Sequence, residues 1–334
     1  MTQHAIETAA AAVRQHLPQV AHPRNPGMAL DLDWVAGVQV NTSAVERRSA
    51  TLPGRRSVKN AWQAAWLLKA VSLIDLTTLS GDDTEGRVAR LCAKARAPVA
   101  PWMLERLGMP GLTVGAVCVY HDMVAAAVRA LEGSGIPVAA VSTGFPAGLS
   151  PFRLRLAEIG ESVGAGAAEI DIVISRRHVL SGNWQALYDE MAEMRAACGP
   201  AHVKAILATG ELGTLRNVMK ASLVCMMAGA DFIKTSTGKE AVNATLPVSL
   251  TMVRAIRAYQ ARTGVRVGYK PAGGISKAKD ALVYLSLMKD ELGAPWLQPA
   301  LFRFGASSLL GDIERQLEHH LTGAYSAANR HAMA

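Results

Sequence analysis

The chain has 334 residues, of which 50% are hydrophobic and 19% are charged, and its formal net charge is +8. No apolar run approaches the ~20 residues that a membrane-spanning helix needs, and the N-terminal segment lacks the basic start and apolar core of a secretory signal. The four cysteines form no CxxC pair, so neither a disulfide framework nor a structural zinc site is expected. The basic residues are not gathered in runs with aromatic residues, which disfavours nucleic acid as a partner. We therefore expect a cytoplasmic protein that binds neither membranes nor nucleic acid.

The first 57 residues are expected to form an N-terminal extension, partly helical or flexible. Residues 1–17 fit one amphipathic helix, and the three prolines and one glycine of residues 18–27 then indicate a linker. Residues 57–71 predict a further helix. In it, Trp62 and Trp66 lie four residues apart, a spacing that favours a stripe facing the core.

Eight short β-rich runs alternate with helical patterns from about residue 70 to residue 322. They are VSLIDLTT, TVGAVCVY, PVAAVSTGF, AEIDIVI, HVKAILATG, DFIKTST, VRVGYKPAGG and LFRFGASS. Strands that alternate with helices form parallel sheets, and eight such units over ~250 residues predict an α/β fold of the (β/α)8 TIM-barrel type. An open doubly wound sheet is the alternative, although no GxGxxG follows the first run. The barrel domain is therefore placed at residues 58–322, with a C-terminal tail at 323–334.

Two lysines are the sharpest chemical feature of these runs. Active sites of TIM barrels lie at the carboxyl ends of the strands, and Lys234 and Lys270 end the sixth and seventh runs. If both point into one pocket, each positive charge disfavours the other, and one amine can be neutral near pH 7, as a Schiff-base lysine requires. Two unrelated lysines that reach solvent are the alternative. Asp171 lies within an apolar run and needs a partner there, which Lys270 would supply.

Three glycine-rich segments follow the sixth, seventh and eighth runs, at residues 237–239, 272–274 and 305–308. Glycine lets the backbone approach an anion, and the N–H groups at a helix start point towards it. Barrels often hold a phosphate with the loops after strands seven and eight. The three segments therefore predict a phosphate site. None of the nine histidines forms an HxH or HExxH pair, so no metal site is expected.

The residues described so far resemble a known family. IDLTTLSGDDT, AVCVY, GFPAG, AEIDIVI, ILATGEL, DFIKTSTGKE, GYKPAGGI and RFGASSLL occur in this order within residues 60–322. Together they resemble the deoxyribose-phosphate aldolases, which are class I aldolases, in the longer form that includes animal members. The resemblance implies reversible cleavage of 2-deoxy-D-ribose 5-phosphate to D-glyceraldehyde 3-phosphate and acetaldehyde, without a cofactor.

The resemblance also implies roles for individual residues. Lys234 would form the imine, Lys270 would tune it, and Asp171 would handle protons through water. Asp75 and Lys204 would belong to the surrounding polar network. The implied phosphate contacts are Gly238, Lys239, Gly273, Gly274, Gly305, Ser307 and Ser308. Thr237 and Cys118 complete the expected substrate site, although Cys118 also fits an inert core thiol.

Some expectations remain open at this stage. His121 follows CVY where many members of the family have proline, and Tyr325 is the one candidate for the C-terminal tyrosine that some members use. A transaldolase-like Schiff-base enzyme for another sugar phosphate and a non-catalytic sugar-phosphate-binding barrel are the competing functions. The expected partner is a small sugar phosphate, and the expected assembly is a homodimer.

Overall fold

The computed structural model describes residues 22–327 and 329–332 of the chain. It contains eight strands, and each falls within one of the eight predicted runs. The strands are β1 (Ile74–Thr77), β2 (Ala116–Tyr120), β3 (Val138–Ser142), β4 (Glu169–Val173), β5 (His202–Ile206), β6 (Phe232–Lys234), β7 (Gly268–Lys270) and β8 (Phe304–Ala306).

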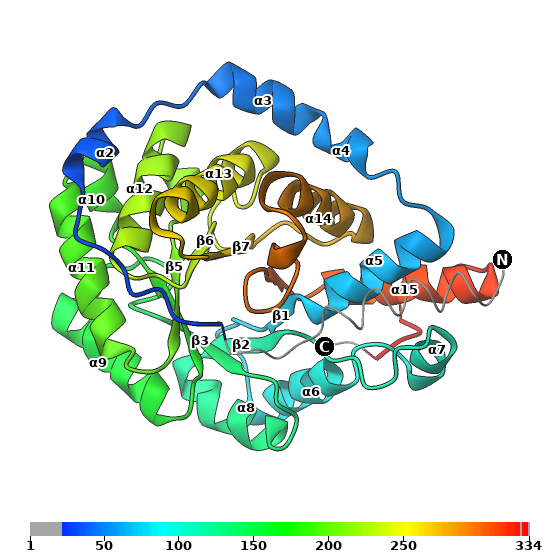
Figure 1. Cartoon of the computed structure of the whole chain (residues 1–334). Coiled ribbons are helices and arrows are strands. Elements are labelled where there is room, and N and C mark those ends of the chain that lie inside the picture. The colour runs from blue at the N-terminus through cyan, green and yellow to red at the C-terminus, as the bar shows by residue number, and fades with distance from the viewer. Residues whose placement is uncertain (1–21, 328, 333–334) are drawn as a thin grey trace.

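The sheet is parallel and closes into a barrel (Figure 1). Its strand order is β7-β6-β5-β4-β3-β2-β1-β8, so β7 and β8 are the two ends. Isolated parallel bridges join these ends, from Tyr269 to Phe302 and from Ala272 to Gly305. The backbone N–H of Gly305 also donates to the carbonyl of Pro271 at 2.9 Å. The predicted TIM barrel is therefore confirmed, and the open sheet is wrong.

Helices alternate with the strands and form the outer ring (Figure 1). Thr84, Thr214 and Thr245 each precede a helix and accept a backbone N–H of its first turn. No helix of the described residues is both long and apolar enough to cross a membrane. The helices are α6 (Glu85–Arg96), α7 (Pro101–Arg106), α8 (Val124–Leu131), α9 (Phe152–Gly164), α10 (Arg176–Leu180), α11 (Trp184–Ala197), α12 (Leu215–Met227), α13 (Leu246–Thr263), α14 (Ala278–Leu292) and α15 (Leu309–Thr322), with short 3-10 turns η1 (His121–Met123), η2 (Thr209–Glu211) and η3 (Ala294–Trp296).

The apolar core lies between the strands and the helices, because side chains alternate between the two faces of a strand. In β4, Ile170 and Ile172 belong to this core, so Glu169 and Asp171 face the barrel interior. In β5, Lys204 faces the interior for the same reason. The interior of the barrel therefore carries charged side chains.

Four helices precede the barrel: α2 (Leu32–Gly37), α3 (Thr42–Ala50), α4 (Leu52–Arg55) and α5 (Asn60–Ser72). The first three cross the outer side of α12, α13 and α14 (Figure 1). The start of this segment is fixed by Asn25, whose backbone N–H donates to Asp231 Oδ1 at 2.7 Å. The Asn25 amide also donates to the carbonyls of Met226 at 2.8 Å and Ala230 at 2.9 Å.

Residues 22–27 are thus anchored to the barrel rather than forming a free linker. The predicted helix at residues 1–17 lies outside the described residues. The domain boundaries at residues 57 and 322 stay predictions.

Helix α5 packs one of its two tryptophans, Trp66, against the core and leaves the other exposed. Trp62 is 55% exposed, so its predicted place on a core-facing stripe was wrong. Trp66 is half-buried, with Lys289 Nζ 5.4 Å from its ring centroid. Ala61 and Ala64 are buried on the other side of the helix, where a small side chain allows close packing.

Candidate active site

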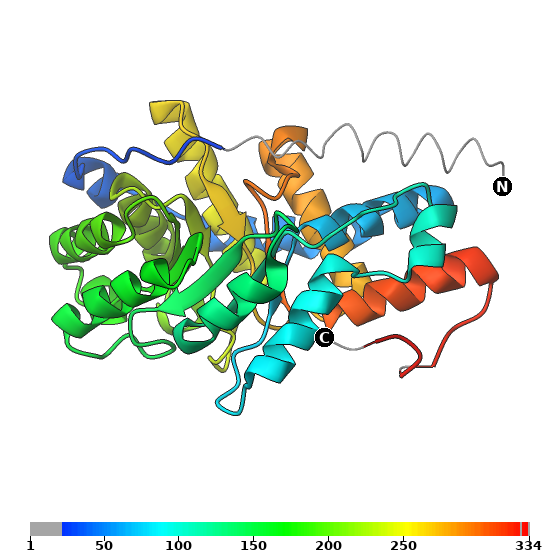
Figure 2. The ribbon, with the colours of Figure 1, turned by 90° about the horizontal axis from the view of Figure 1, so that it is seen from below.

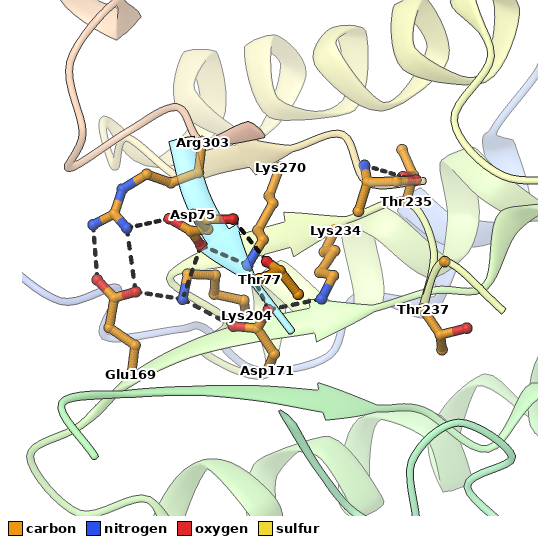
Figure 3. Close-up of polar contacts among 12 residues, drawn as sticks. Asp75, Thr77, Glu169, Asp171, Lys204, Lys234, Thr235, Thr237, Lys270 and Arg303 are labelled. Atoms are coloured by element: carbon orange, nitrogen blue, oxygen red, sulfur yellow. Dashed lines mark hydrogen bonds and ion pairs between the residues drawn. The ribbon is translucent and has the colours of Figure 1, made fainter. Parts of the chain in front are cut away.

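Lys234 and Lys270 are the last residues of β6 and β7, and the parallel register pairs them directly. Both side chains point into the barrel (Figure 3), where Lys234 is 2% exposed and Lys270 is 0% exposed. Both amines donate to Asp171 Oδ2, Lys234 Nζ at 2.8 Å and Lys270 Nζ at 2.7 Å. The two lysines therefore share one carboxylate oxygen inside the barrel, and the alternative of unrelated, solvent-reaching lysines is wrong.

Backbone and threonine hydrogen bonds hold these two strand ends side by side. The carbonyl of Lys234 accepts from Leu207 N at 3.0 Å, and that of Lys270 accepts from Thr235 N at 3.1 Å. Thr235 Oγ1 accepts from the N–H of Ala272 at 3.0 Å. The two bonds of Thr235 tie the end of β6 to the end of β7, and the bond of Leu207 ties β6 to the segment after β5, so the two amines keep a common register.

A second set of contacts continues from the lysines through the barrel interior (Figure 3). Lys204 Nζ donates to Asp171 Oδ1 at 2.8 Å and to Glu169 Oε2 at 2.5 Å. Lys270 Nζ lies 2.5 Å from Asp75 Oδ2. We call the connected set the buried charge network. Its members are Asp75, Glu169, Asp171, Lys204, Lys234, Lys270 and Arg303.

Arg303, the residue before β8, closes this network. Its Nη1 donates to Asp75 Oδ1 at 2.5 Å, and its Nη2 donates to Glu169 Oε1 at 2.8 Å. Asp171, Lys204 and Asp75 do not lie at the carboxyl ends of their strands but one level deeper, where the register pairs Asp171 with Lys204. Of the residues in the network, only the two lysines lie at the predicted carboxyl ends of strands. The other charged side chains lie deeper in the barrel, towards the amino ends of the strands, as far as Glu169 and Arg303.

The two active-site lysines differ in the direction of their pKa. Burial lowers the pKa of the Lys234 amine, and the charge of Lys270 lowers it further, against the opposing effect of Asp171. Burial alone would lower the pKa of Lys270 as well, but the charges of Asp171 and Asp75 outweigh it and raise that pKa. An amine with a lowered pKa therefore lies beside an amine with a raised pKa, an arrangement that suits covalent amine chemistry.

The other members of the network are all held in their charged forms. Burial opposes the charge of Asp171, but the surrounding lysines, Lys204 foremost, hold its pKa well below the usual range. In the same way, Arg303 and other cations lower the pKa values of Asp75 and Glu169. Burial also acts on Lys204, yet the nearby carboxylates raise its pKa.

The sequence prediction missed Glu169 and Arg303, although both carry a readable signal. Glu169 lies two residues before Asp171 in the same strand, so it must face the same side. Arg303 stands between Phe302 and Phe304, and a charge inside an apolar run needs a partner as much as Asp171 does.

Cys118 lies in a small apolar cluster on the inner wall of the barrel. It is buried with Ala139 and Val141, and the partly buried Tyr120 and Phe145 pack against them. Burial raises the pKa of the Cys118 thiol, which keeps it neutral. The cluster makes this part of the inner wall apolar, and a substrate contact by Cys118 stays a prediction.

The three glycine-rich segments lie next to one another around the barrel mouth, through the contacts of Ala272 with Thr235 and Gly305. Gly273 has a φ of 79°, and a Cβ there would lie 2.6 Å from the Asn243 side chain, so only glycine fits. The N-cap of α15 is Ser308, whose side chain caps no N–H group. Exposed positions in these segments are Gly238, Lys239, Gly274, Ser307 and Ser308, while Gly305 is half-buried and Thr237 is buried.

Glu240 already occupies the first of these segments. Its carboxylate accepts from Thr237 N at 3.0 Å, from Thr237 Oγ1 at 2.8 Å and from Gly238 N at 3.2 Å. The segment thus presents several donors to an anion, and the anion in this structure is a side chain of the chain itself.

The two open positions from the sequence lie outside the network. His121 begins η1 with Nδ1 3.4 Å from Glu158 Oε1. Tyr325 is 68% exposed and stacks on His319 of α15 with ring centroids 3.9 Å apart. The segment that carries it turns back beside α15 (Figure 2), where His331 Nε2 lies 2.8 Å from Glu318 Oε2. Within the described part of the chain, no group of three or more His, Cys, Asp or Glu side chains has a metal-binding arrangement.

The chain is similar to known aldolases over most of its length. The model of the "DeoC/LacD family aldolase" matches residues 69–313. A Mus musculus protein named deoxyribose-phosphate aldolase is 61% identical over 311 residues, which cover 92% of this chain and 97% of that protein. The Homo sapiens protein of the same name is 59% identical over 307 residues, which cover 91% of this chain and 96% of that protein.

A solved structure supports the fold independently. A Toxoplasma gondii crystal structure matches with a TM-score of 0.67 at 22% identity, covering 77% of this chain and 96% of that chain, which shows the fold alone. The family expected from the sequence is confirmed by the family model and by the mammalian relatives. This chain therefore belongs to the DeoC/LacD family of aldolases.

Proposed function

We propose that this protein is a deoxyribose-phosphate aldolase that works through a Schiff base on Lys234. It would cleave 2-deoxy-D-ribose 5-phosphate reversibly to D-glyceraldehyde 3-phosphate and acetaldehyde. The observation that carries the proposal is the pair of buried lysines with opposite pKa directions on one oxygen of Asp171. The mammalian relatives, identical at 61% and 59% of positions, carry the name of this activity.

In the proposed reaction, the uncharged amine of Lys234 attacks the aldehyde carbon C1 of the open sugar and releases water. The protonated imine then draws electrons from the C2–C3 bond as that bond breaks, while the C3 hydroxyl loses its proton. D-glyceraldehyde 3-phosphate leaves, and the enamine of acetaldehyde stays on Lys234. Protonation at C2 and hydrolysis of the imine release acetaldehyde and restore the free amine.

Asp171 is the proposed proton carrier of this sequence. Its Oδ2 contacts both amines, which places it beside any carbon bound to Lys234. A water held by Asp171 would accept the C3 hydroxyl proton and later return a proton to C2. Lys270, which stays charged, disfavours protonation of the free Lys234 amine and holds Asp171 in place.

Two buried hydroxyls support a hydrogen-bonding ligand near this position. Ser236 Oγ and Thr209 Oγ1 are buried without a hydrogen-bond partner in the structure. An unpaired buried hydroxyl costs about 1–3 kcal/mol. We propose that these groups bind the hydroxyls of the sugar.

The competing functions make different demands on the chain. A non-catalytic barrel would need the phosphate segments but not a buried lysine with a lowered pKa. A transaldolase-like enzyme would turn over a ketose donor in place of 2-deoxyribose 5-phosphate. A coupled assay for glyceraldehyde 3-phosphate from 2-deoxyribose 5-phosphate separates the aldolase from both alternatives, and turnover of a ketose donor separates those two. The expected homodimer and cytoplasmic location stay predictions.

The substitution Ser308→Asp is expected to raise KM for 2-deoxyribose 5-phosphate by roughly 10- to 100-fold, since it puts a negative charge at the proposed phosphate position. KM for unphosphorylated 2-deoxyribose should change by less than about threefold, because the introduced carboxylate interacts only weakly with an uncharged sugar. Thr322→Asp, at the opposite end of α15, is the matched control. Equal losses for both sugars would mean that the segment is only structural.

Glu240→Gln is expected to lower KM for the phosphorylated sugar several-fold. The Glu240 carboxylate binds N–H groups that the phosphate would use. The uncharged amide of glutamine binds these N–H groups more weakly than a carboxylate, so it competes less with the phosphate. Inhibition by inorganic phosphate should strengthen in parallel, measured in the same assay. A rise in KM would instead show that Glu240 organises the segment for the substrate.

A further inference from the structure

Glu169 and Arg303 lie at the end of the buried charge network that is far from Lys234. Both border a cavity of about 530 Å³ at the amino ends of the strands, together with His202, the first residue of β5. Neither touches Lys234, and the contacts that connect them to it pass through other members of the network (Figure 3). Substrate at Lys234 would therefore not meet them.

The charges of the network balance only when Lys234 is neutral. Asp75, Glu169 and Asp171 contribute three negative charges. Three positive charges come from Lys204, Lys270 and Arg303. A proton on Lys234 would leave one unbalanced positive charge on an almost fully buried side chain, and burying an unpaired charge is costly.

We propose that Arg303 and Glu169 are positioning residues that fix the charge of Lys234 from the opposite end of the barrel. Arg303 holds Asp75 and Glu169 as ions, and these in turn hold Lys270 and Lys204 as cations. Lys234 is then the member left without a proton. This inference rests on the proposed function of Lys234 and adds the residues that set its charge.

Apart from His202, which lies beside Glu169 and whose pKa burial lowers, the ionisable groups on the neighbouring strands leave no other source of balance. Asp171 comes from β4 and Lys204 from β5, while Asp75 and Lys270 come from β1 and β7. β2 contributes Cys118, whose raised pKa keeps it neutral. β3 and β8 contain no ionisable side chain, and the charge beside β8 is Arg303 itself.

Single substitutions at the two positions should move the titration of Lys234 in opposite directions. Arg303→Met leaves one excess negative charge, which favours the protonated form of the Lys234 amine. The acidic limb of the pH profile of kcat/KM therefore moves to higher pH. Glu169→Gln leaves one excess positive charge and moves it to lower pH. For two charges roughly 10 Å apart at an effective dielectric constant of about 20, each shift is about one pH unit.

The double variant Arg303→Met with Glu169→Gln restores the charge balance. Its acidic limb should return to within about 0.3 pH units of the unmodified protein, although two buried contacts are lost. A merely structural role would instead make the double variant the worst of the three. This return is the sharpest expected result.

The test measures the pH dependence of acetaldehyde trapping by borohydride on Lys234, together with kcat/KM for 2-deoxyribose 5-phosphate. Arg155→Met is the matched control, because Arg155 is equally buried and pairs with Glu190 outside the network. It should lose thermal stability and keep the acidic limb in place. If Arg303→Met does not fold, two other variants replace it in the test. Arg303→Lys keeps the charge, so its acidic limb should stay in place. Glu169→Gln keeps the shape of the side chain, and its acidic limb should still move to lower pH.

Shifts in the same direction for both single variants, a double variant that does not return, or an equal shift in Arg155→Met would overturn the inference. An unmodified protein that traps no acetaldehyde on Lys234 would remove the proposed function itself. Trapping with an unchanged pH profile in every variant would remove only the roles of Arg303 and Glu169.

Discussion

Replacement of Lys234 by arginine is expected to lower kcat/KM for 2-deoxyribose 5-phosphate by on the order of 10⁴- to 10⁶-fold, the range seen when a covalent nucleophile is removed. The guanidinium can still reach Asp171, but it cannot lose its proton or form an imine. The melting temperature of the variant should also fall, because the permanent charge of the guanidinium is the unbalanced buried charge that a neutral Lys234 avoids.

The position of the covalent bond can be read directly. Acetaldehyde and borohydride should add one ethyl group to the peptide that contains Lys234, as located by mass spectrometry after digestion. The label should vanish in Lys234→Arg. A label on Lys270 would reverse the roles of the two lysines, and the absence of any specific label would remove the Schiff-base mechanism.

The second large effect is expected for Lys270 and Asp171 as one unit. Lys270→Met and Asp171→Asn should each lower kcat/KM by on the order of 10²- to 10⁴-fold, because each breaks the arrangement around the shared oxygen. The double variant should be no more than about tenfold worse than the worse single one, since residues that act together give non-additive losses. It also removes one charge of each sign, which keeps the network balanced.

The measurement is a double-mutant cycle on kcat/KM. Lys270→Met combined with Arg155→Met serves as the reference cycle, because Arg155 pairs with Glu190 outside the network, and these losses should multiply. If the losses of Lys270→Met and Asp171→Asn also multiplied fully, the two residues would act independently and the proposed unit would be refuted.

The sequence predicted the strands and the two lysines because their signals are local. Each strand is a short β-rich run before a helical pattern, and Lys234 and Lys270 stand at the ends of two neighbouring runs. The partners of Arg303 could not be read in the same way. Its contacts with Asp75 and Glu169 span 228 and 134 positions of the chain and exist only because the barrel closes.

The prediction of how α5 and the N-terminal segment pack failed for a related reason. The side of α5 that is buried depends on α14 and α15, against which it packs, and no pattern within α5 reports their position. The two tryptophans suggested a core stripe, yet Ala61 and Ala64 face inward and leave Trp62 exposed. The anchoring of Asn25 likewise needs Asp231, which lies 206 positions further along the chain.

The contact of Asn25 makes the N-terminal extension a part of the catalytic barrel. Asp231 immediately precedes β6, three residues before Lys234, and its carboxylate binds both Asn25 N and Val203 N, the latter at 2.8 Å. A shortened protein that began at residue 58 would leave Asp231 Oδ1 without the backbone donor it has now, beneath the strand that carries the proposed nucleophile. An aldolase of this form therefore cannot be reduced to its barrel without giving that carboxylate a new partner.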